Sequence, residues 1–226
     1  MKEYNLLSDY SKTKVKRFVG KGIRTIEHRI IASERERLFF DGDRNYGYGG
    51  LKYDGRWLSV AKKIIKKFNL KNNSKVLHIA SEKGFLIHEI KKFNPRINIL
   101  GLETSKYAIN KTIKPVKKFV KKVKTFSDLS SINTKFDCII ALGAVYILTL
   151  NDAILLLKNI QRLSKGKSFI TLASYETEKD YWMFKNWTVL GTLLFKKEEW
   201  RKIMKHSGYT GYYSFTNSKK LKLKRK

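Results

Sequence analysis

The chain is 226 residues long and 42% apolar, which is enough to bury one substantial core, so we expect one folded domain with an N-terminal extension. Its 49 basic and 19 acidic residues give a formal net charge of +30, which attracts anionic molecules. No apolar run approaches the roughly 18 residues that a membrane helix needs, so no membrane span is predicted.

The N-terminal quarter of the chain is predicted to lie outside the main domain. Residues 1–38 read as a basic helical arm, in which Ile26, Ile30 and Ile31 could pack on the core. Residues 39–57 are rich in tyrosine and glycine and are expected to form a cap, so the whole extension is residues 1–57. The apolar spacing of residues 58–70 then predicts an amphipathic helix that leads into a sheet.

A strand, a tight turn and a helix are predicted next. The apolar residues between Lys75 and Ile79 suit a strand that is covered on both faces. Helical spacing begins after Gly84, and a second strand ends about twenty residues later at Glu103. In a doubly wound α/β domain this layout builds a nucleoside-binding crevice at the carboxyl ends of the strands. A carboxylate at the position of Glu103 can accept both hydrogen bonds of a ribose diol.

The rest of the chain alternates in the same way. Strands are predicted at about 120–126, 136–142 and 168–173, with a helix at 152–163. The predicted fold class is therefore α/β, a Rossmann-like, doubly wound and mostly parallel sheet in residues 58–218. The basic tail, residues 219–226, is expected to fray.

Together these segments resemble the class I S-adenosylmethionine-dependent methyltransferases, of the short kind associated with small-molecule or glycan modification. The resemblance runs from about Phe39 to Phe215, and the stretch from Lys197 to Phe215 resembles the family's last helix and closing strand. In that family the first strand usually ends in an acidic residue and a Gly-x-Gly-x-Gly loop, and here the corresponding residues are His78, Ala80, Glu82 and Gly84. Only the last glycine is present, and Glu82 adds an anion beside the expected place of the methionine carboxylate.

The resemblance implies S-adenosyl-L-methionine as the cofactor and suggests which residues hold it. Glu103 would bind the ribose, Asp128 would accept a hydrogen bond from the adenine amino group, and the strand before Leu142 would end beside the methyl donor. Methyl transfer is an in-line displacement in which the enzyme mainly positions the two reactants. The implied cofactor-binding residues are His78, Ala80, Gly84, Glu103, Thr104, Ser127, Asp128, Leu129 and Leu142, and the candidate catalytic residues that orient the acceptor are Tyr46, Tyr48 and Tyr146.

Three functions remain open. The first is a methyltransferase for a small-molecule acceptor, such as a sugar or another anionic metabolite. The second is a methyltransferase-like binding or scaffold protein, suggested by the loop at Ala80 and Glu82. The third, an RNA methyltransferase or RNA-binding protein, depends on charge alone, and the lysine pairs fall on the polar faces of predicted helices.

Two further expectations concern metal and location. The four histidines lack the paired spacing of a zinc site, so no metal is predicted. The single cysteine, Cys138, excludes an internal disulfide, and residues 1–21 are too polar and basic for a secretion signal. We therefore expect a cytoplasmic protein.

Overall fold

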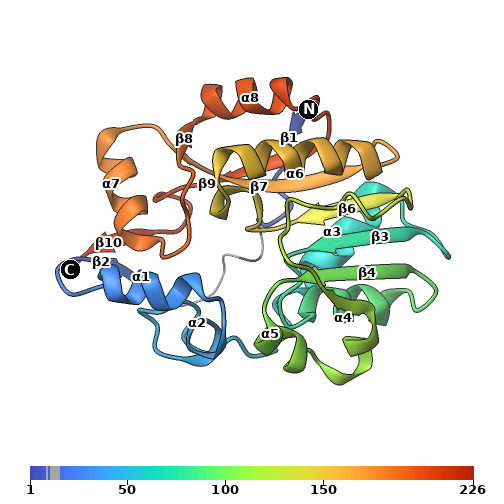
Figure 1. The fold of residues 1–226 in the computed structure, drawn as a ribbon, viewed down its shortest axis with the longest axis horizontal. Helices are drawn as coiled ribbons and strands as arrows, with labels where there is room; N and C mark the ends of the chain where they lie inside the picture. The colour runs from blue at the N-terminus through green and yellow to red at the C-terminus, as the bar shows by residue number, and fades with distance from the viewer. Residues whose placement is uncertain (9, 11–15) are drawn as a thin grey trace.

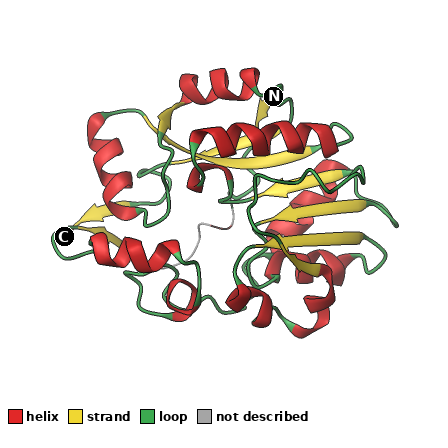
Figure 2. Ribbon diagram, in the orientation of Figure 1, coloured by secondary structure: helices red, strands yellow, loops and turns green. Residues whose placement is uncertain are grey.

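The computed structural model describes residues 1–8, 10 and 16–226, which build an eight-stranded sheet with helices on both faces (Figures 1 and 2). The strand order is β1-β9-β7-β6-β3-β4-β5, and β8 pairs with β7 beside this path. Each strand pairing in this sheet is parallel. The predicted fold class, a Rossmann-like α/β fold with a doubly wound sheet, is confirmed.

The predicted strands are present with shifts at their ends, and the largest shift is in β5, which ends at Lys122 instead of near residue 126. They are β3 (Lys75–Ile79), β4 (Asn98–Glu103), β5 (Val120–Lys122), β6 (Cys138–Ala141), β7 (Ser168–Tyr175) and β9 (Tyr212–Thr216), with the short β8 at Phe195–Lys196. The main connecting helices are α3 (Leu58–Phe68), α4 (Phe85–Phe93), α5 (Lys106–Asn110), α6 (Leu150–Leu163), α7 (Glu178–Trp187) and α8 (Lys197–His206), and two short 3₁₀ helices are η2 (Lys114–Phe119) and η3 (Val145–Ile147).

The two faces of the sheet are buried by different helices. Leu77 and Ile79 of β3 share a core with α6 and α8, where Trp200 is completely buried. Val76, one residue along the same strand, belongs to a second core with α3 and α4. Alternate residues of one strand thus serve opposite cores, which explains why the strand reads as a continuous apolar run rather than an alternating one.

The sheet reverses its direction of growth between β3 and β6. From β3 the order runs to β4 and β5 on one side, and from the adjacent β6 it runs to β7 and β9 on the other. In doubly wound sheets ligands bind at the carboxyl ends of the strands at such a switch point. The loops after β3, β4, β5 and β6 are therefore the place to look for a site.

The N-terminal arm differs from the helical arm predicted. β1 (Lys2–Glu3) extends the main sheet beside β9, and β2 (Arg17–Val19) pairs in parallel with β10 (Leu223–Arg225) in a separate two-stranded sheet. The prediction that the basic tail frays is wrong, because its backbone is hydrogen-bonded to β2. The expected packing of Ile26 and Ile30 on the core is also wrong, since they are 69% and 60% exposed.

The segment between the arm and α3 forms a cap over one end of the sheet, and we call residues 25–57 the cap. It contains α1 (Ile26–Ser33), which lies near α7 in Figure 1, and α2 (Arg37–Asp41). Arg29 donates hydrogen bonds to the carbonyls of Thr188 and Lys185 at 2.5 and 2.9 Å, where α7 ends. Since the last carbonyls of a helix lack partners within the helix, a guanidinium group stabilises this contact.

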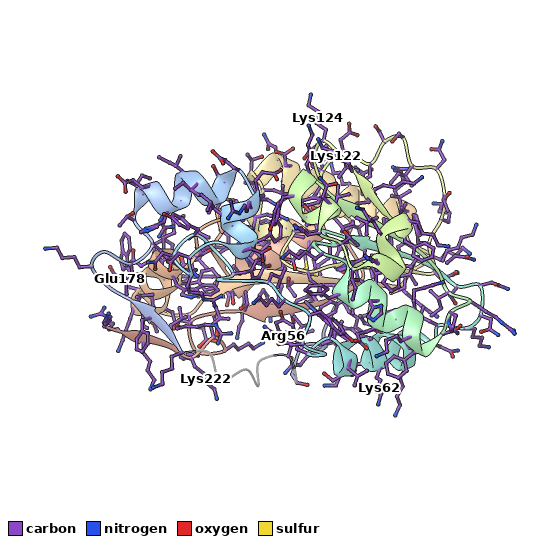
Figure 3. The ribbon with its side chains drawn as sticks, turned by 90° about the horizontal axis from the view of Figure 1, so that it is seen from below. Arg56, Lys62, Lys122, Lys124, Glu178 and Lys222 are labelled. Atoms are coloured by element: carbon purple, nitrogen blue, oxygen red, sulfur yellow. The ribbon has the colours of Figure 1, made fainter. Side chains whose placement is uncertain are left out.

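The positive charge is distributed over different sides of the protein. Figure 3 shows the side chains of Lys62, Lys124 and Lys222 extending outward from separate parts of the ribbon. Within the described ranges no helix has the length and apolar character to cross a membrane. The same part of the chain holds no group of three His, Cys, Asp or Glu residues that could bind a metal ion.

Candidate functional site

The loop that follows β3 has an unusual backbone. Ala80 and Glu82 have φ angles of 58° and 51°, and Gly84, which precedes α4, has a φ of 75°. Left-handed conformations are common for glycine and cost other residues about 1–2 kcal/mol. The loop therefore takes turns that usually require glycine, although glycine occupies only the last of these three positions.

Glu103 lies at the end of β4, and its side chain is completely buried. One carboxylate oxygen, Oε1, accepts hydrogen bonds from the backbone amides of Thr104 at 2.8 Å and Ser105 at 3.1 Å. The other, Oε2, accepts from the amide of Glu82 at 2.9 Å. Burial alone would raise the pKa of Glu103, but the charge of Arg35 and these hydrogen bonds lower it below its usual value. Glu103 is therefore held as a carboxylate.

Arg35, from the cap, also contacts this carboxylate. Its Nη2 lies 3.1 Å from Oε1 and 3.3 Å from Oε2 of Glu103. The guanidinium carbon lies within 6 Å of three aromatic rings, at 5.5 Å from Phe39, 5.8 Å from Phe40 and 5.4 Å from Phe126. The role of Arg35 could not be predicted from the sequence, because nothing in the residues around it marks a partner 68 positions away.

A cavity of about 280 Å³ adjoins this ion pair. Thr104 lines it after β4, Thr125 and Phe126 line it after β5, and Ile147 lines it from η3. Arg35 and its neighbours close the cap side. The complete lining is Ser33, Glu34, Arg35, Thr104, Lys124, Thr125, Phe126, Ile147 and Leu148. The cavity thus lies at the carboxyl edge of the sheet, beside the buried carboxylate.

Glu82 connects the loop after β3 to the cap. The hydroxyl of Tyr48 donates a hydrogen bond to Glu82 Oε1. Burial raises the pKa of Glu82 to about 7, although Tyr48 and the charge of Arg35 act in the opposite direction. Burial, followed by the charge of Glu82, raises the pKa of Tyr146 to about 12. Glu82, Tyr48 and Tyr146 therefore form one electrostatically connected group, with a carboxyl group that can exchange a proton near neutral pH.

The three candidate acceptor-orienting tyrosines do not all meet. Tyr48 and Tyr146 come from the cap and from η3, and both interact with Glu82. Tyr46 instead packs against the ring of His28, with ring centroids 5.2 Å apart. The structure thus brings two of the three together.

The predicted adenine contacts after β5 make other bonds. Ser127 is buried, and its hydroxyl donates to Asp152 at 2.8 Å. Asp128 is exposed and accepts hydrogen bonds from the amide and hydroxyl of Ser130. Leu129 is buried in the core that contains α6 and α8, and Leu142 packs against the core that contains α3 and α4. Phe126 and Thr125, just before these residues, line the cavity instead.

Three buried polar atoms near the crevice have no hydrogen-bond partner within the described residues. They are Nδ1 of His78, Oγ of Ser81 and Nε of Arg35. Burial lowers the pKa of His78 to about 4, so this histidine is neutral. Because buried polar atoms are nearly always paired with protein, water or a ligand, these three indicate that small polar groups belong in this region.

Comparisons with known proteins support a fold and no closer relationship. No protein-family model and no curated protein sequence matches the chain. Among solved structures, the YcgJ protein from Bacillus subtilis has a TM-score of 0.52 at 16% identity, with 65% of this chain and 66% of that one aligned. The protein described as a methyltransferase in its complex with the Haloferax volcanii Trm112 methyltransferase activator has a TM-score of 0.51 at 15% identity, with 66% of each chain aligned.

The alignment thus spans just under two thirds of each of these two neighbours. The plantazolicin methyltransferase BpumL, solved in complex with SAH, aligns over 64% of this chain and 58% of its own, with a TM-score of 0.46 at 20% identity. Strand order, switch point and the first two neighbours agree with the resemblance seen in the sequence. The chain has the fold of the class I S-adenosylmethionine-dependent methyltransferases.

Proposed function

We propose that the protein is an S-adenosylmethionine-dependent methyltransferase with a small-molecule acceptor. The observation that carries this proposal is the buried carboxylate of Glu103 beside a cavity of about 280 Å³ at the switch-point edge of a methyltransferase fold. Glu103 would hold the ribose, and the cavity between Thr104 and Phe126 would take the adenine. The unpaired atoms of His78 and Ser81 fit a polar ligand in the same crevice.

The residues around Glu82 suggest how the acceptor would be handled. The bound cofactor supplies an electrophilic methyl group. Tyr48 and Tyr146 would orient the acceptor, and Glu82, with its pKa near 7, would take the proton that the acceptor loses. Such a base is needed where the atom that receives the methyl group carries a hydroxyl or ammonium proton.

Charge near the cap favours an anionic acceptor. Arg44 lies beside Tyr48 and donates a hydrogen bond to its backbone carbonyl. The pKa of Arg44 is lowered by burial and then by the charge of Arg17, which shows that these two positive groups lie close enough to repel each other. A small anion would relieve this repulsion. The outward lysines lie on several sides instead of lining one groove, which supports a small molecule over RNA (Figure 3).

The buried, free thiol of Cys138 supports our proposal of a cytoplasmic location, where thiols stay reduced.

Binding measurements test the main proposal directly. Titration calorimetry with S-adenosylmethionine and with its demethylated product should show binding below millimolar concentration. Glu103→Gln should weaken it by about 1–3 kcal/mol, because a buried hydrogen-bond acceptor pair is lost.

Asp137→Asn is a matched control, because Asp137 lies just before β6 and accepts from the amide of Lys75 at the opposite ends of the strands. Its affinity should equal that of the unaltered protein. If neither ligand gives heat at millimolar concentration, the enzyme proposal fails. The alternative is then a binding or scaffold protein, and the ion pair between Arg35 and Glu103 favours it specifically.

A further inference from the structure

The oxygens that a ribose diol would need are already used by the protein itself. Arg35 Nη2 is within hydrogen-bond distance of both carboxylate oxygens of Glu103. The remaining donors, the amides of Glu82, Thr104 and Ser105 and the hydroxyl of Thr104, come from the loops that form the crevice. Arg35 is the side chain from the cap in this set. Of the groups that bind Glu103, it is therefore the one that a movement of the cap can remove.

The backbone at Arg35 is strained. Its φ is 51°, a left-handed conformation that is unfavourable for a residue with a side chain. Arg35 lies between the end of α1 at Ser33 and the start of α2 at Arg37, so the strain is located at a joint between two helices. Strained residues persist where surrounding contacts hold them, and the contact with Glu103 is such a restraint.

The guanidinium is also incompletely paired. Its Nε is buried and has no partner within the described residues, although arginine in an enclosed site is usually fully bonded. The side chain borders the cavity of about 280 Å³. The arrangement with Glu103 thus leaves one donor of Arg35 without an acceptor, beside a volume into which the side chain has space to turn.

We propose that Arg35 is an internal competitor for the ribose site: it binds Glu103 in the ligand-free protein and must leave before an adenosyl ligand can bind there. When Arg35 leaves Glu103, the joint at residues 33–37 moves with its side chain. This inference rests on the proposed function, because it assumes that Glu103 binds ribose. It makes cofactor affinity depend on the position of the cap.

Other contacts set how far the cap moves. Lys83 Nζ contacts both carboxylate oxygens of Asp41 at 2.6 Å, so the end of α2 is tied to the loop after β3. Glu36 accepts hydrogen bonds from the amides of Lys106 and Tyr107, at 3.1 and 2.9 Å, at the start of α5. The contact of Lys83 with Asp41 involves neither Glu103 nor the joint, so it can stay in place while Arg35 turns away, whereas Glu36 lies within the joint and its bonds are released with it. The movement is therefore expected to be confined to the joint.

The test compares Arg35→Met with the unaltered protein by titration calorimetry with S-adenosylhomocysteine. Methionine keeps an unbranched apolar stem against the three aromatic rings and removes the competing charge. We expect the affinity to rise at least tenfold. The control is Arg29→Met, which removes another guanidinium of the cap, one bonded to the end of α7, and the affinity of this variant should equal that of the unaltered protein.

Hydrogen exchange of the unaltered protein gives a second readout that does not depend on how well the variant folds. On adding S-adenosylhomocysteine, amides at residues 33–37 should exchange at least threefold faster, while those at 103–105 should be protected. If the unaltered protein binds and Arg35→Met binds no more tightly, or if residues 33–37 become protected, the competition is refuted and the proposed function stands. If neither protein binds at millimolar ligand, both proposals fail together.

Discussion

Replacing Glu82 with glutamine should change how the stability of the protein depends on pH. Glu82 and His78 lie in the same crevice, and burial shifts their pKa values in opposite directions. The pKa of Glu82 rises from 4.5 to about 7, and that of His78 falls from 6.5 to about 4. Each side chain therefore favours its neutral form in the folded protein, and each binds a different number of protons when the chain unfolds.

The two contributions oppose each other between pH 4.5 and 6.5. The folded state keeps the proton of Glu82 where the unfolded state loses it, so this contribution is complete below pH 4.5 and disappears as pH rises through about 7. Below pH 6.5 His78 binds a proton in the unfolded state but stays neutral in the folded state. The stability that His78 contributes is therefore complete above pH 6.5 and disappears as pH falls through about 4. Each shift corresponds to about 3 kcal/mol.

Chemical denaturation at pH 4.5, 5.5 and 6.5 measures the effect. Relative to the unaltered protein, Glu82→Gln should gain stability as pH rises, by about 1 kcal/mol per pH unit. His78→Asn should lose stability over the same range at a similar rate. Other carboxyl groups contribute equally to all three proteins, so only the differences between the curves matter. If the difference curve for Glu82→Gln is flat, the carboxyl group titrates normally and our description of the crevice is wrong.

Two further substitutions and one deletion test local features of the fold. Gly84→Ala should lower the free energy of unfolding by about 2 kcal/mol, because the φ of Gly84 is +75° and a Cβ there would lie 2.9 Å from Thr112 Cγ2. A loss of less than about 0.5 kcal/mol would show that the loop adapts to the added methyl group. Lys222→Gly should raise the free energy of unfolding by about 0.5–1 kcal/mol, since this exposed residue has a φ of 53°, and an unchanged denaturation midpoint would contradict the argument. Deleting residues 223–226 should lower the melting temperature, because β2 loses its partner strand. Lys224→Ala, which removes a charge but keeps the strand, is the control and should leave the melting temperature unchanged. Equal melting temperatures for the deletion and the Lys224→Ala variant would support a frayed tail.

The central sheet was predictable because its strands are buried on both faces. Mostly apolar runs such as those of β3 and β6 can be recognised without knowing which strands they pair with. The pairing of β2 with β10 was not predictable, because each is three residues long and about 200 residues separate them. Strands that short carry no usable periodicity.

The site was predictable only in part. The position of Glu103 follows from strand order, which the sequence pattern indicates. The contact of Arg35 with it does not, since it depends on how the cap folds back across the sheet. Ala80 and Glu82 show a second limit: counting glycines suggests a lost loop, yet both residues take left-handed conformations.

The pairing of β1 with β9 and of β2 with β10 has a consequence for synthesis in the cell. The first two strands emerge from the ribosome long before the partners that cover them. At about 5–20 residues per second, nearly 200 further residues take roughly 10–40 s to appear. During that interval the basic leading segment is exposed beside an incomplete sheet edge, and only translation of the last strands closes it.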